Sequence, residues 1–341
     1  MRTKENMEKG KKGDLEKAVS SAIEELKEKQ KLSAIHIYAS TLNSYINFCQ
    51  KYEYSIIVAD TFVIGRLKEY QSWLRRNGLG WNSVSTYMRT LRAIYNRICP
   101  PGTFGHDPKL FEDLHTKVES HTKRALTEGQ MRTLMTLDPD KLPPQLQRTV
   151  AYFLLMFFFR GMPFIDLAHL NKKDMKGNVI IYCRHKTGKQ MTVHIPKRAM
   201  ALVEKYKDRR NNSSYLFPIL PPGEEEAWEL YQSYLKALRQ FNKELVKLGD
   251  MLLGVKISSY TARHTWATLS YYLGVPVGLI CEALGHSSIR VTENYLKPFE
   301  GERVDKANDE VITSVMEGKS RKKIPRKRLK YSSLYNPLLT E

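Results

Sequence analysis

The sequence predicts a mainly α-helical protein of about two domains, with one small β-hairpin. The chain has 341 residues, of which 42% are hydrophobic, so it is long enough to build two cores. Apolar residues recur at intervals of three and four, a spacing typical of helices that pack one face. Residues 178–195 instead carry two β-rich arms around a Thr-Gly-Lys turn, which indicates a hairpin.

Three amphipathic helices are expected in the N-terminal part. Their apolar stripes are Leu32, Ile35, Ala39, Leu42, Ile46 and Cys49; Val63, Leu67, Tyr70 and Leu74; and Val84, Tyr87, Leu91, Ile94 and Ile98. Asp60 is the expected N-cap of the second helix, Gly78 its stop, and Ser83 the start of the third. We therefore predict a helical domain over residues 31–117, preceded at 1–30 by a charged extension, either a solvated helix or a flexible segment.

A second domain is expected over residues 125–300. Residues 118–124 are polar and basic and form the predicted linker. Thr127 and Gln130 have the spacing of a capping box, which opens a new helix. The hairpin lies inside this second domain, and residues 301–341 are expected to be a C-terminal segment with a basic tail.

The charge of the chain indicates a polyanionic partner. It carries 55 Lys and Arg against 36 Asp and Glu, a net charge of +19. Such an excess favours nucleic acid, because basic side chains that neutralise phosphates release counterions. The basic residues are spread along the whole chain rather than gathered on one amphipathic helix, which disfavours a membrane surface. Arg89 and Arg92 lie off the apolar stripe of their helix, and Lys123 and Arg124 lie in the linker; these four are candidate DNA contacts, although a solvated helix face also explains the first two.

Other features exclude several classes of site. The four cysteines, Cys49, Cys99, Cys183 and Cys281, are far apart and form no CxxC pair, which argues against zinc and against a disulfide framework. The longest apolar run, residues 150–159, is about half of a bilayer span. The N-terminus has no apolar core of a secretory signal. We expect a soluble cytoplasmic protein without a cofactor.

Breaking a phosphodiester without a metal requires particular side chains. Two guanidiniums can hold the non-bridging oxygens, a proton donor serves the leaving 5′-oxygen, and an oriented hydroxyl attacks. Arg263 lies in "SSYTARHTWATL", where a helix brings Tyr260 and His264 to the same face. An Arg-His pair on an amphipathic helix is also a common structural feature.

Four more residues are candidates, each with an ordinary alternative. Arg160 ends an apolar run and needs an anion, either Asp166 or a substrate phosphate. Lys186, in the hairpin turn, is either solvated or catalytic. His286 follows Gly285 and is either a turn histidine that bonds backbone or a phosphate ligand. Tyr295 is either a buried aromatic residue or a nucleophile.

The order of these residues resembles the tyrosine recombinase, or phage-type integrase, family. "ALGHSSIRVTENYL", residues 283–296, closely matches the family's last motif, and the interval from Arg263 to His286 also fits. The resemblance covers residues 32–300. It implies a SAM-like helical core-binding domain followed by a catalytic domain of the DNA-breaking-rejoining fold.

The resemblance also implies a role for each residue. Tyr295 would be the nucleophile that forms a 3′-phosphotyrosyl link, and Arg160 and Arg263 would clamp the scissile phosphate. Lys186 would protonate the leaving 5′-hydroxyl, and His286 would hydrogen-bond the phosphate. Family members use neither metal nor ATP and act as tetramers on two DNA sites. Their C-terminal segment packs on a neighbouring protomer, a role that residues 306–318 would take here.

Two positions depart from the family pattern. Pro163 stands where the family has the arginine of G-x-R, and Arg160 lies one helical turn earlier. This R-G-M-P-F pattern resembles a subgroup of recombinases from bacterial mobile elements and invertible DNA regions. Tyr260 replaces the usual histidine of H-x-x-R, which leaves His286 or His264 as the acceptor of the nucleophile's proton.

The leading hypothesis is a site-specific DNA recombinase for integration and excision or for inversion. The partners are then duplex recombination sites, further copies of the chain and, in some systems, accessory host proteins. A catalytically silent DNA-binding accessory protein on the same fold is the alternative, and a type IB topoisomerase-like enzyme is a third. The basic tail at 320–330 either adds non-specific phosphate contacts or is simply solvated.

Overall fold

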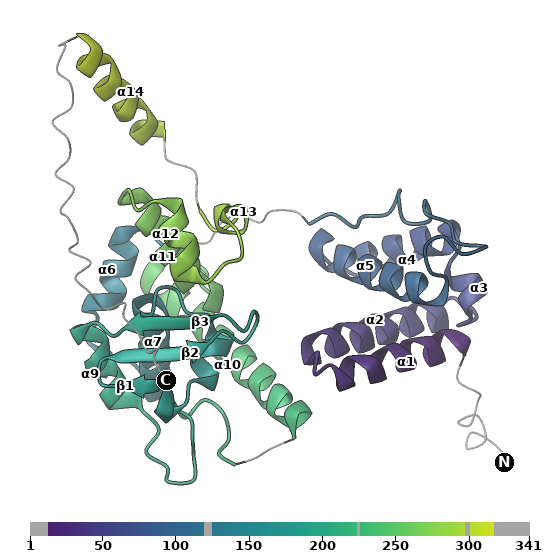
Figure 1. Ribbon diagram of the computed structural model, residues 1–341, viewed down its shortest axis with the longest axis horizontal. Helices are drawn as coiled ribbons and strands as arrows, with labels where there is room; N and C mark the ends of the chain where they lie inside the picture. The colour runs from purple at the N-terminus through teal and green to yellow at the C-terminus, as the bar shows by residue number, and fades with distance from the viewer. Residues whose placement is uncertain (1–12, 119–124, 224–225, 297–300, 317–341) are drawn as a thin grey trace, which may run out of the picture. The chain divides into compact units, whose positions relative to one another are not determined.

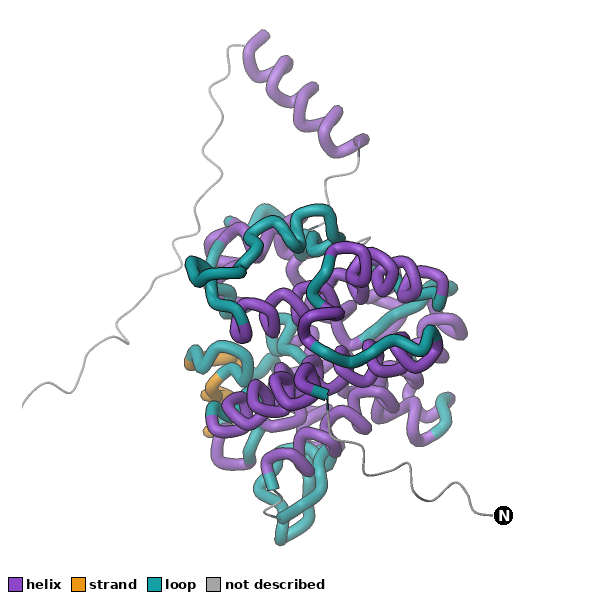
Figure 2. The backbone as a smooth tube through the Cα atoms, turned by 90° about the vertical axis from the view of Figure 1, so that its right-hand side faces the viewer, coloured by secondary structure: helices purple, strands orange, loops and turns teal. Residues whose placement is uncertain are grey.

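The computed structural model describes residues 13–118, 125–223, 226–296 and 301–316. These residues divide into two compact units, one with 13–118, 168–172 and 207–240, and the other with 125–167, 173–206 and the described residues from 241 onward. Helices make up most of both units, and the strands are confined to one small sheet (Figure 1, Figure 2). The predicted fold class, mainly α with a small β-hairpin, is confirmed.

Five helices form the N-terminal part of the first unit: α1 (Asp14–Glu28), α2 (Leu32–Lys51), α3 (Val58–Thr61), α4 (Ile64–Arg76) and α5 (Trp81–Ile98). The predicted apolar stripes supply part of its core: Tyr70 and Leu74 are fully buried, whereas Val63 and Ile98 are exposed. Phe48, which no predicted stripe included, is also fully buried, and its ring lies 5.2 Å from that of Tyr70 between centroids. Aromatic packing of this kind dominates the energetics of small helical cores.

Helix α1 belongs to this core, although the sequence predicted a charged extension up to residue 30. Leu15 and Val19 are each 1% exposed, and α1 packs against α2 and α5. The prediction is wrong here because the few apolar residues of α1 all fall on one face, so a strongly charged helix still buries a narrow stripe.

Two predicted helix starts are also wrong. Asp60 does not cap α4, whose N-cap is Val63; it lies in the short helix α3, where its carboxylate accepts a hydrogen bond from Ser55. Helix α5 begins at Trp81 after Gly80, so Ser83 lies inside its first turn. Both errors are shifts of a few residues at helix ends, which local sequence specifies weakly.

The second unit is built mainly from α6 (Glu128–Thr136), α7 (Pro144–Phe158), α9 (Lys197–Tyr206), α11 (Ser259–Tyr272), α12 (Val277–Leu284) and α13 (Ile289–Glu293). The predicted capping box opens α6: the backbone nitrogen of Gln130 lies 3.2 Å from Oγ1 of Thr127, and the nitrogen of Thr127 lies 3.0 Å from Oε1 of Gln130. The apolar helix α7 packs against α9 and α11 and supplies much of the core.

The remaining elements are α8 (Phe164–His169), α10 (Ala227–Leu253), α14 (Gly301–Met316) and the short 3-10 helices η1 (Pro139–Lys141) and η2 (Lys172–Asp174). No described helix is both long enough and apolar enough to cross a lipid bilayer.

The sheet is antiparallel, in the order β1 (Met175–Lys176), β2 (Val179–Cys183), β3 (Gln190–His194), as Figure 1 shows. Strands β2 and β3 pair from Val179 opposite His194 to Cys183 opposite Gln190, which confirms the predicted hairpin. Ile180 and Tyr182 face the core, in the alternation expected of a sheet with one buried face.

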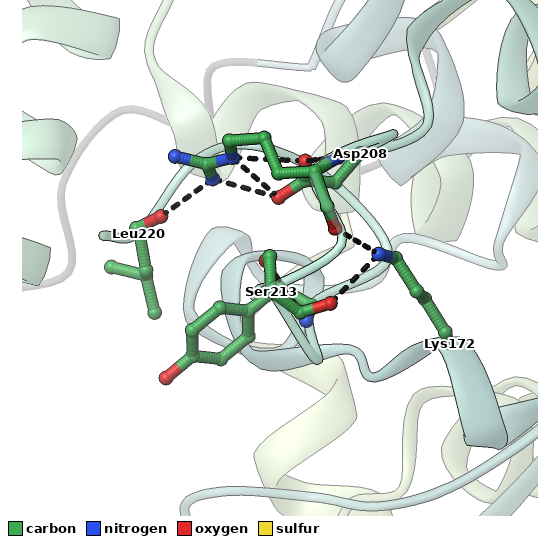
Figure 3. A network of polar contacts seen from close by, with 6 residues as sticks. Lys172, Asp208, Ser213 and Leu220 are labelled. Carbon is green, nitrogen blue, oxygen red and sulfur yellow. Dashed lines mark hydrogen bonds and ion pairs between the residues drawn. The ribbon is translucent and has the colours of Figure 1, made fainter. Parts of the chain in front are cut away.

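A polar network fixes the loop after α9 (Figure 3). Nζ of Lys172 donates to the backbone carbonyls of Arg210, at 2.8 Å, and Ser213, at 2.7 Å. The Arg210 guanidinium pairs with Asp208 at 2.7 Å and also donates to the carbonyl of Leu220. These hydrogen bonds from Arg210 hold the pKa of Asp208 well below its usual range, so the pair stays charged near neutral pH.

Candidate active site

The centre of the candidate site is Arg263, on the first turns of α11. It is 2% exposed. Its Nη1 donates to the carbonyl of Gly161 at 2.7 Å, and its Nη2 donates to the carbonyl of Leu284 at 2.5 Å and lies 2.9 Å from Nε2 of His286. Burial, and next the positive charge of Arg184, lowers the pKa of Arg263 to about 10, so the guanidinium remains charged at neutral pH.

Gly161 allows the chain to pass close to Arg263. Its φ is +69°, and a Cβ at this position would lie 3.0 Å from Cα of Arg263. A side chain would therefore be strained by the backbone and would also push against the arginine. The Arg160-Gly161 turn thus delivers a carbonyl acceptor to the buried guanidinium.

Arg160 lies in the same turn, with φ of +57°. Its side chain is half-buried, and Nη1 contacts the carbonyl of Thr192 on β3 at 3.4 Å, a long hydrogen bond. The sequence offered Asp166 as one partner for Arg160, and this alternative is wrong: the carboxylate of Asp166 faces Arg184 instead. Arg160 forms no ion pair with the described residues.

Arg184 is the residue that sequence reasoning missed. It is 7% exposed, its Nη1 donates to the carbonyl of Gly285 at 2.7 Å, and its Nε lies 3.6 Å from Oδ2 of Asp166. Burial raises the pKa of Asp166, against the opposing effects of the His185 backbone N–H and of Arg184. The signal was available, because Ile180 and Tyr182 are the buried positions of β2 and Arg184, one residue beyond its end, continues the same alternation.

His286 follows the left-handed Gly285, which ends α12 with φ of +65°. The side chain is 8% exposed; its Nδ1 lies 3.0 Å from Oγ1 of Thr292, and its Nε2 contacts Arg263. Burial, and then the positive charges of Arg263, Arg184 and Lys186, lowers the pKa of His286 from 6.5 to about 3. The imidazole is therefore neutral at physiological pH, and its partners are side chains rather than the backbone.

The ring of Tyr295 lies between two imidazoles. Its centroid is 4.7 Å from that of His264 and 4.8 Å from that of His286. The guanidinium carbon of Arg263 is 5.6 Å from the same centroid. The backbone carbonyl of Tyr295 is held by Nδ1 of His264 and Oγ1 of Thr268, each at 3.3 Å. The ring is half-buried, packed by its faces and held in place by its backbone.

Tyr260 and Lys186 lie at the edge of this group. Tyr260 precedes Arg263 by one turn of α11, is 59% exposed, and has its ring 6.5 Å from that of His264. Lys186 is exposed in the β2–β3 turn, where the nitrogens of Thr187 and Gly188 both bond the carbonyl of Arg184. The buried arginine thus anchors the turn that presents the lysine.

The candidate DNA contacts fall into two groups. Arg89 and Arg92 are exposed on α5, and Nε of Arg89 bonds the carbonyl of Ser85 at 3.3 Å. Lys123, Arg124 and the basic tail at 320–330 lie outside the described residues, as do the last two residues of the 306–318 segment.

Metal coordination is not supported by the described part of the chain, which contains no group of three or more His, Cys, Asp or Glu side chains that could hold an ion. The convergent groups are instead three arginines, a lysine, two histidines and two tyrosines. Three guanidiniums in one site can bind an oxyanion whose charge is spread over several oxygens.

Comparison with known families and proteins gives a consistent result. The model described as "Phage integrase family" matches residues 124–302, and that described as "Phage integrase SAM-like domain" matches residues 14–108. Tyrosine recombinase XerA of Thermococcus onnurineus is 27% identical over 227 residues, which cover 66% of this chain and 73% of the relative. Tyrosine recombinase XerC of Pseudomonas fluorescens is 20% identical over 293 residues, 82% of this chain and 91% of the relative.

Solved structures share the fold. The Tn1549 transposon integrase in complex with circular intermediate DNA superposes with a TM-score of 0.58 at 16% identity, over 87% of this chain and 99% of that chain. The XerH site-specific recombinase bound to a palindromic difH substrate gives a TM-score of 0.57 at 18% identity, over 83% of this chain and 80% of that chain.

Proposed function

Because the chain belongs to the phage integrase family, we propose that its site cuts and rejoins DNA through a phosphotyrosine at Tyr295. The chain is a site-specific DNA recombinase, and the proposal assigns its chemistry to named residues. The observation that carries it is the placement of Tyr295 beside the buried guanidinium of Arg263 and between two imidazoles.

The proposed roles follow from the contacts. Arg263 and Arg160 hold the non-bridging oxygens of the scissile phosphate. The resemblance gave His286 as a further phosphate ligand, but its Nε2 lies on Arg263 and its Nδ1 on Thr292, so we assign it instead to holding Arg263 in place. Lys186, exposed on the hairpin turn, protonates the 5′-oxygen as it leaves. Tyr260 is exposed beside Arg263 and contacts the phosphate without acting as a base, since a phenol is rarely ionised at neutral pH.

Tyr295 attacks the phosphorus, and the bond from phosphorus to the 5′-oxygen breaks. The phenolic proton passes to the imidazole of His264, whose ring lies 4.7 Å from that of Tyr295, and the departing oxygen takes a proton from Lys186. The resulting phosphotyrosyl ester retains the energy of the phosphodiester, so a 5′-hydroxyl can reverse the step without ATP. Pre-placed positive charge stabilises the transition state because the donors need not reorganise when the negative charge develops.

Trapping the covalent intermediate tests the proposal. Duplexes that bind the purified protein are first selected from a randomised pool. A nick is then placed near the cleavage point so that the short fragment that carries the freed 5′-hydroxyl diffuses away. We expect a covalent protein–DNA adduct with the wild type and none with Tyr295→Phe. A wild type that binds the selected duplex without any adduct would reject the assignment.

We further propose the finer biology suggested by the R-G-M-P-F sequence around Arg160. The chain would act in the cytoplasm on a mobile element or an invertible DNA region, by integration and excision or by inversion. A plasmid with two selected sites in opposite orientation separates the outcomes: inversion changes the restriction map, whereas relaxation without exchange indicates topoisomerase-like activity. Activity that appears only when a host extract is added indicates an accessory protein.

A tetramer on DNA is also proposed, with the C-terminal segment packing on a neighbouring protomer. Val311, Ile312, Val315 and Met316 of α14 are exposed, with Asp309 and Glu310 beside them. A cavity of about 720 Å³ between α6 and α11 is lined by apolar side chains such as Met131, Leu269 and Leu273, together with Arg132 and Arg198.

The apolar side chains of α14 match the apolar lining of the cavity, and its acidic side chains match the two arginines. We therefore propose that this cavity receives α14 of a second copy of the chain. Val315→Asp should reduce the tetrameric fraction on a two-site DNA in sedimentation experiments and leave binding to a single site unchanged. An unaltered assembly of this variant would exclude α14 as the docking segment.

A further inference from the structure

Thr292 contacts both the backbone of Tyr295 and the imidazole of His286. It lies in α13, is fully buried, and precedes Tyr295 by three residues. Its carbonyl accepts the backbone N–H of Tyr295 at 2.8 Å, and its Oγ1 lies 3.0 Å from Nδ1 of His286. A single residue therefore joins the segment that carries the tyrosine to the histidine of the candidate site.

The hydrogen bonds around His286 fix its tautomer. A guanidinium can only donate, so Nε2, at 2.9 Å from Nη2 of Arg263, must be the acceptor. In a neutral imidazole the proton then sits on Nδ1, where Oγ1 of Thr292 accepts it. The threonine hydroxyl has its own acceptor in the carbonyl of Ser288, at 3.5 Å.

The surroundings keep the imidazole neutral. The charged groups that face it are Arg263 from α11 and Arg184 and Lys186 from the β2–β3 hairpin, all positive. The ring of Tyr295 and the thiol of Cys281, which contacts the His286 carbonyl at 3.8 Å, are the other groups beside it. Nothing among these neighbours replaces Thr292 as an acceptor for Nδ1–H.

We propose that Thr292 is a positioning residue that, together with Arg263, holds His286 in the Nδ1–H form: Arg263 donates to Nε2, and Thr292 accepts from Nδ1, which would otherwise be a buried donor without an acceptor. With the proton on Nδ1, the lone pair of Nε2 holds Nη2 of the clamp. With the proton on Nε2, two donors would face each other and Arg263 would have to turn away. Thr292 also accepts the backbone N–H of Tyr295. The packing of α13 therefore positions both Tyr295 and Arg263.

The inference rests on the proposed function for its effect on the rate, whereas the tautomer itself does not depend on activity. Thr292→Val removes the hydroxyl at nearly constant volume and keeps the carbonyl, and Thr292→Ser restores the hydroxyl. Thr90→Val is the matched control, since Thr90 is a buried helical threonine whose hydroxyl bonds the carbonyl of Thr86 in its own helix.

Two measurements decide the proposal. The ¹⁵N shifts of the His286 imidazole in the free protein report the tautomer, and the rate of adduct formation on the nicked duplex reports the chemistry. We expect the Nδ1–H form in the wild type, in Thr292→Ser and in Thr90→Val, and its loss in Thr292→Val. We also expect adduct formation by Thr292→Val to be slowed at least ~10-fold at unchanged DNA affinity, as when a group that orients a catalytic imidazole is removed.

The outcomes are separable. If Thr292→Val keeps the Nδ1–H form, the proposal is overturned even when the variant is slow, because the residue is then only structural. If Thr292→Val does not fold, Thr292→Ala carries the same expectations. Absence of any adduct with the wild type would reject the proposed function, and the ¹⁵N shifts would still decide the role of Thr292.

Discussion

Nη1 of Arg184 lies 2.7 Å from the carbonyl oxygen of Gly285, so the β2–β3 hairpin and the end of α12 are tied together directly. The same guanidinium faces the buried carboxylate of Asp166. Lys186 and His286, two residues of the candidate site, are each close in sequence to one end of this link. Arg184 therefore fixes the spacing between these two residues.

We predict that Arg184→Met destabilises the protein by on the order of 3 kcal/mol, because it leaves the Asp166 carboxylate buried without its partner. The double variant Arg184→Met, Asp166→Asn should recover part of this loss in urea unfolding, since no unpaired charge remains. Equal stability of the single and double variants would show that the pair is not coupled.

Arg160 is predicted to supply the first guanidinium of the clamp. Its turn conformation and its weak contact with Thr192 leave it able to reach a phosphate. Arg160→Ala should slow adduct formation by at least ~10²-fold, comparable to the loss of one oxyanion donor. Arg160→Lys should recover only part of the rate, because an ammonium cannot bind two oxygens as a planar fork. Near-normal rates in Arg160→Ala would transfer the role to another residue, of which buried Arg184 is a candidate.

The sequence predicted much of this arrangement, for identifiable physical reasons. The hairpin at 178–195 and the capping box at Thr127 are local patterns, and both are confirmed. The contacts of Arg184 with Asp166 and of His286 with Thr292 depend on tertiary packing, which sequence patterns do not show. The burial of α1 was missed because its many charged residues obscured a three-residue stripe.

A comparison of Gly161 with Gly177 separates the effect of backbone strain from the effect of contact with Arg263. Gly161 and Gly177 both have positive φ, +69° and +60°, but a Cβ at Gly161 meets Arg263 whereas one at Gly177 meets nothing within 4 Å. Gly177→Ala should therefore cost only about 1 kcal/mol in unfolding free energy and leave cleavage intact. Gly161→Ala should cost more and should slow adduct formation, because the buried clamp is displaced. Equal effects of the two substitutions would mean that the close approach to Arg263 is unimportant.

The buried, neutral state of His286 predicts a pH dependence of stability. Its pKa is about 3 in the folded protein and 6.5 in the reference state. Above 6.5 both states are neutral and the residue adds no pH dependence. As the pH falls from 6.5 towards 3, the unfolded chain takes up a proton that the folded protein refuses, so stability is lost.

As the pH is lowered through this window, the free energy of unfolding should therefore fall more for the wild type than for His286→Gln. Urea titrations at fixed ionic strength measure this difference. An NMR titration of the imidazole should show no protonation of the folded protein near pH 5. Protonation at about 6.5 would contradict the burial of His286 among positive charges.

The basic face of α5 gives the last prediction. Arg89 and Arg92 are exposed, whereas Arg97 on the same helix is ion-paired with Glu25 of α1. If Arg89 contacts phosphate, Arg89→Ala should weaken DNA binding and reduce the slope of log affinity against log salt by about 1, because one fewer counterion is released. Arg97→Ala is the control and should leave the slope unchanged, since its charge is already compensated.

A second comparison separates the two kinds of DNA contact. The loss of affinity in Arg89→Ala should be similar for the selected duplex and for a scrambled one if Arg89 contacts the DNA backbone. It should be larger for the selected duplex if Arg89 reads a base. A slope that is identical in the wild type and Arg89→Ala would remove this face of α5 from the DNA interface.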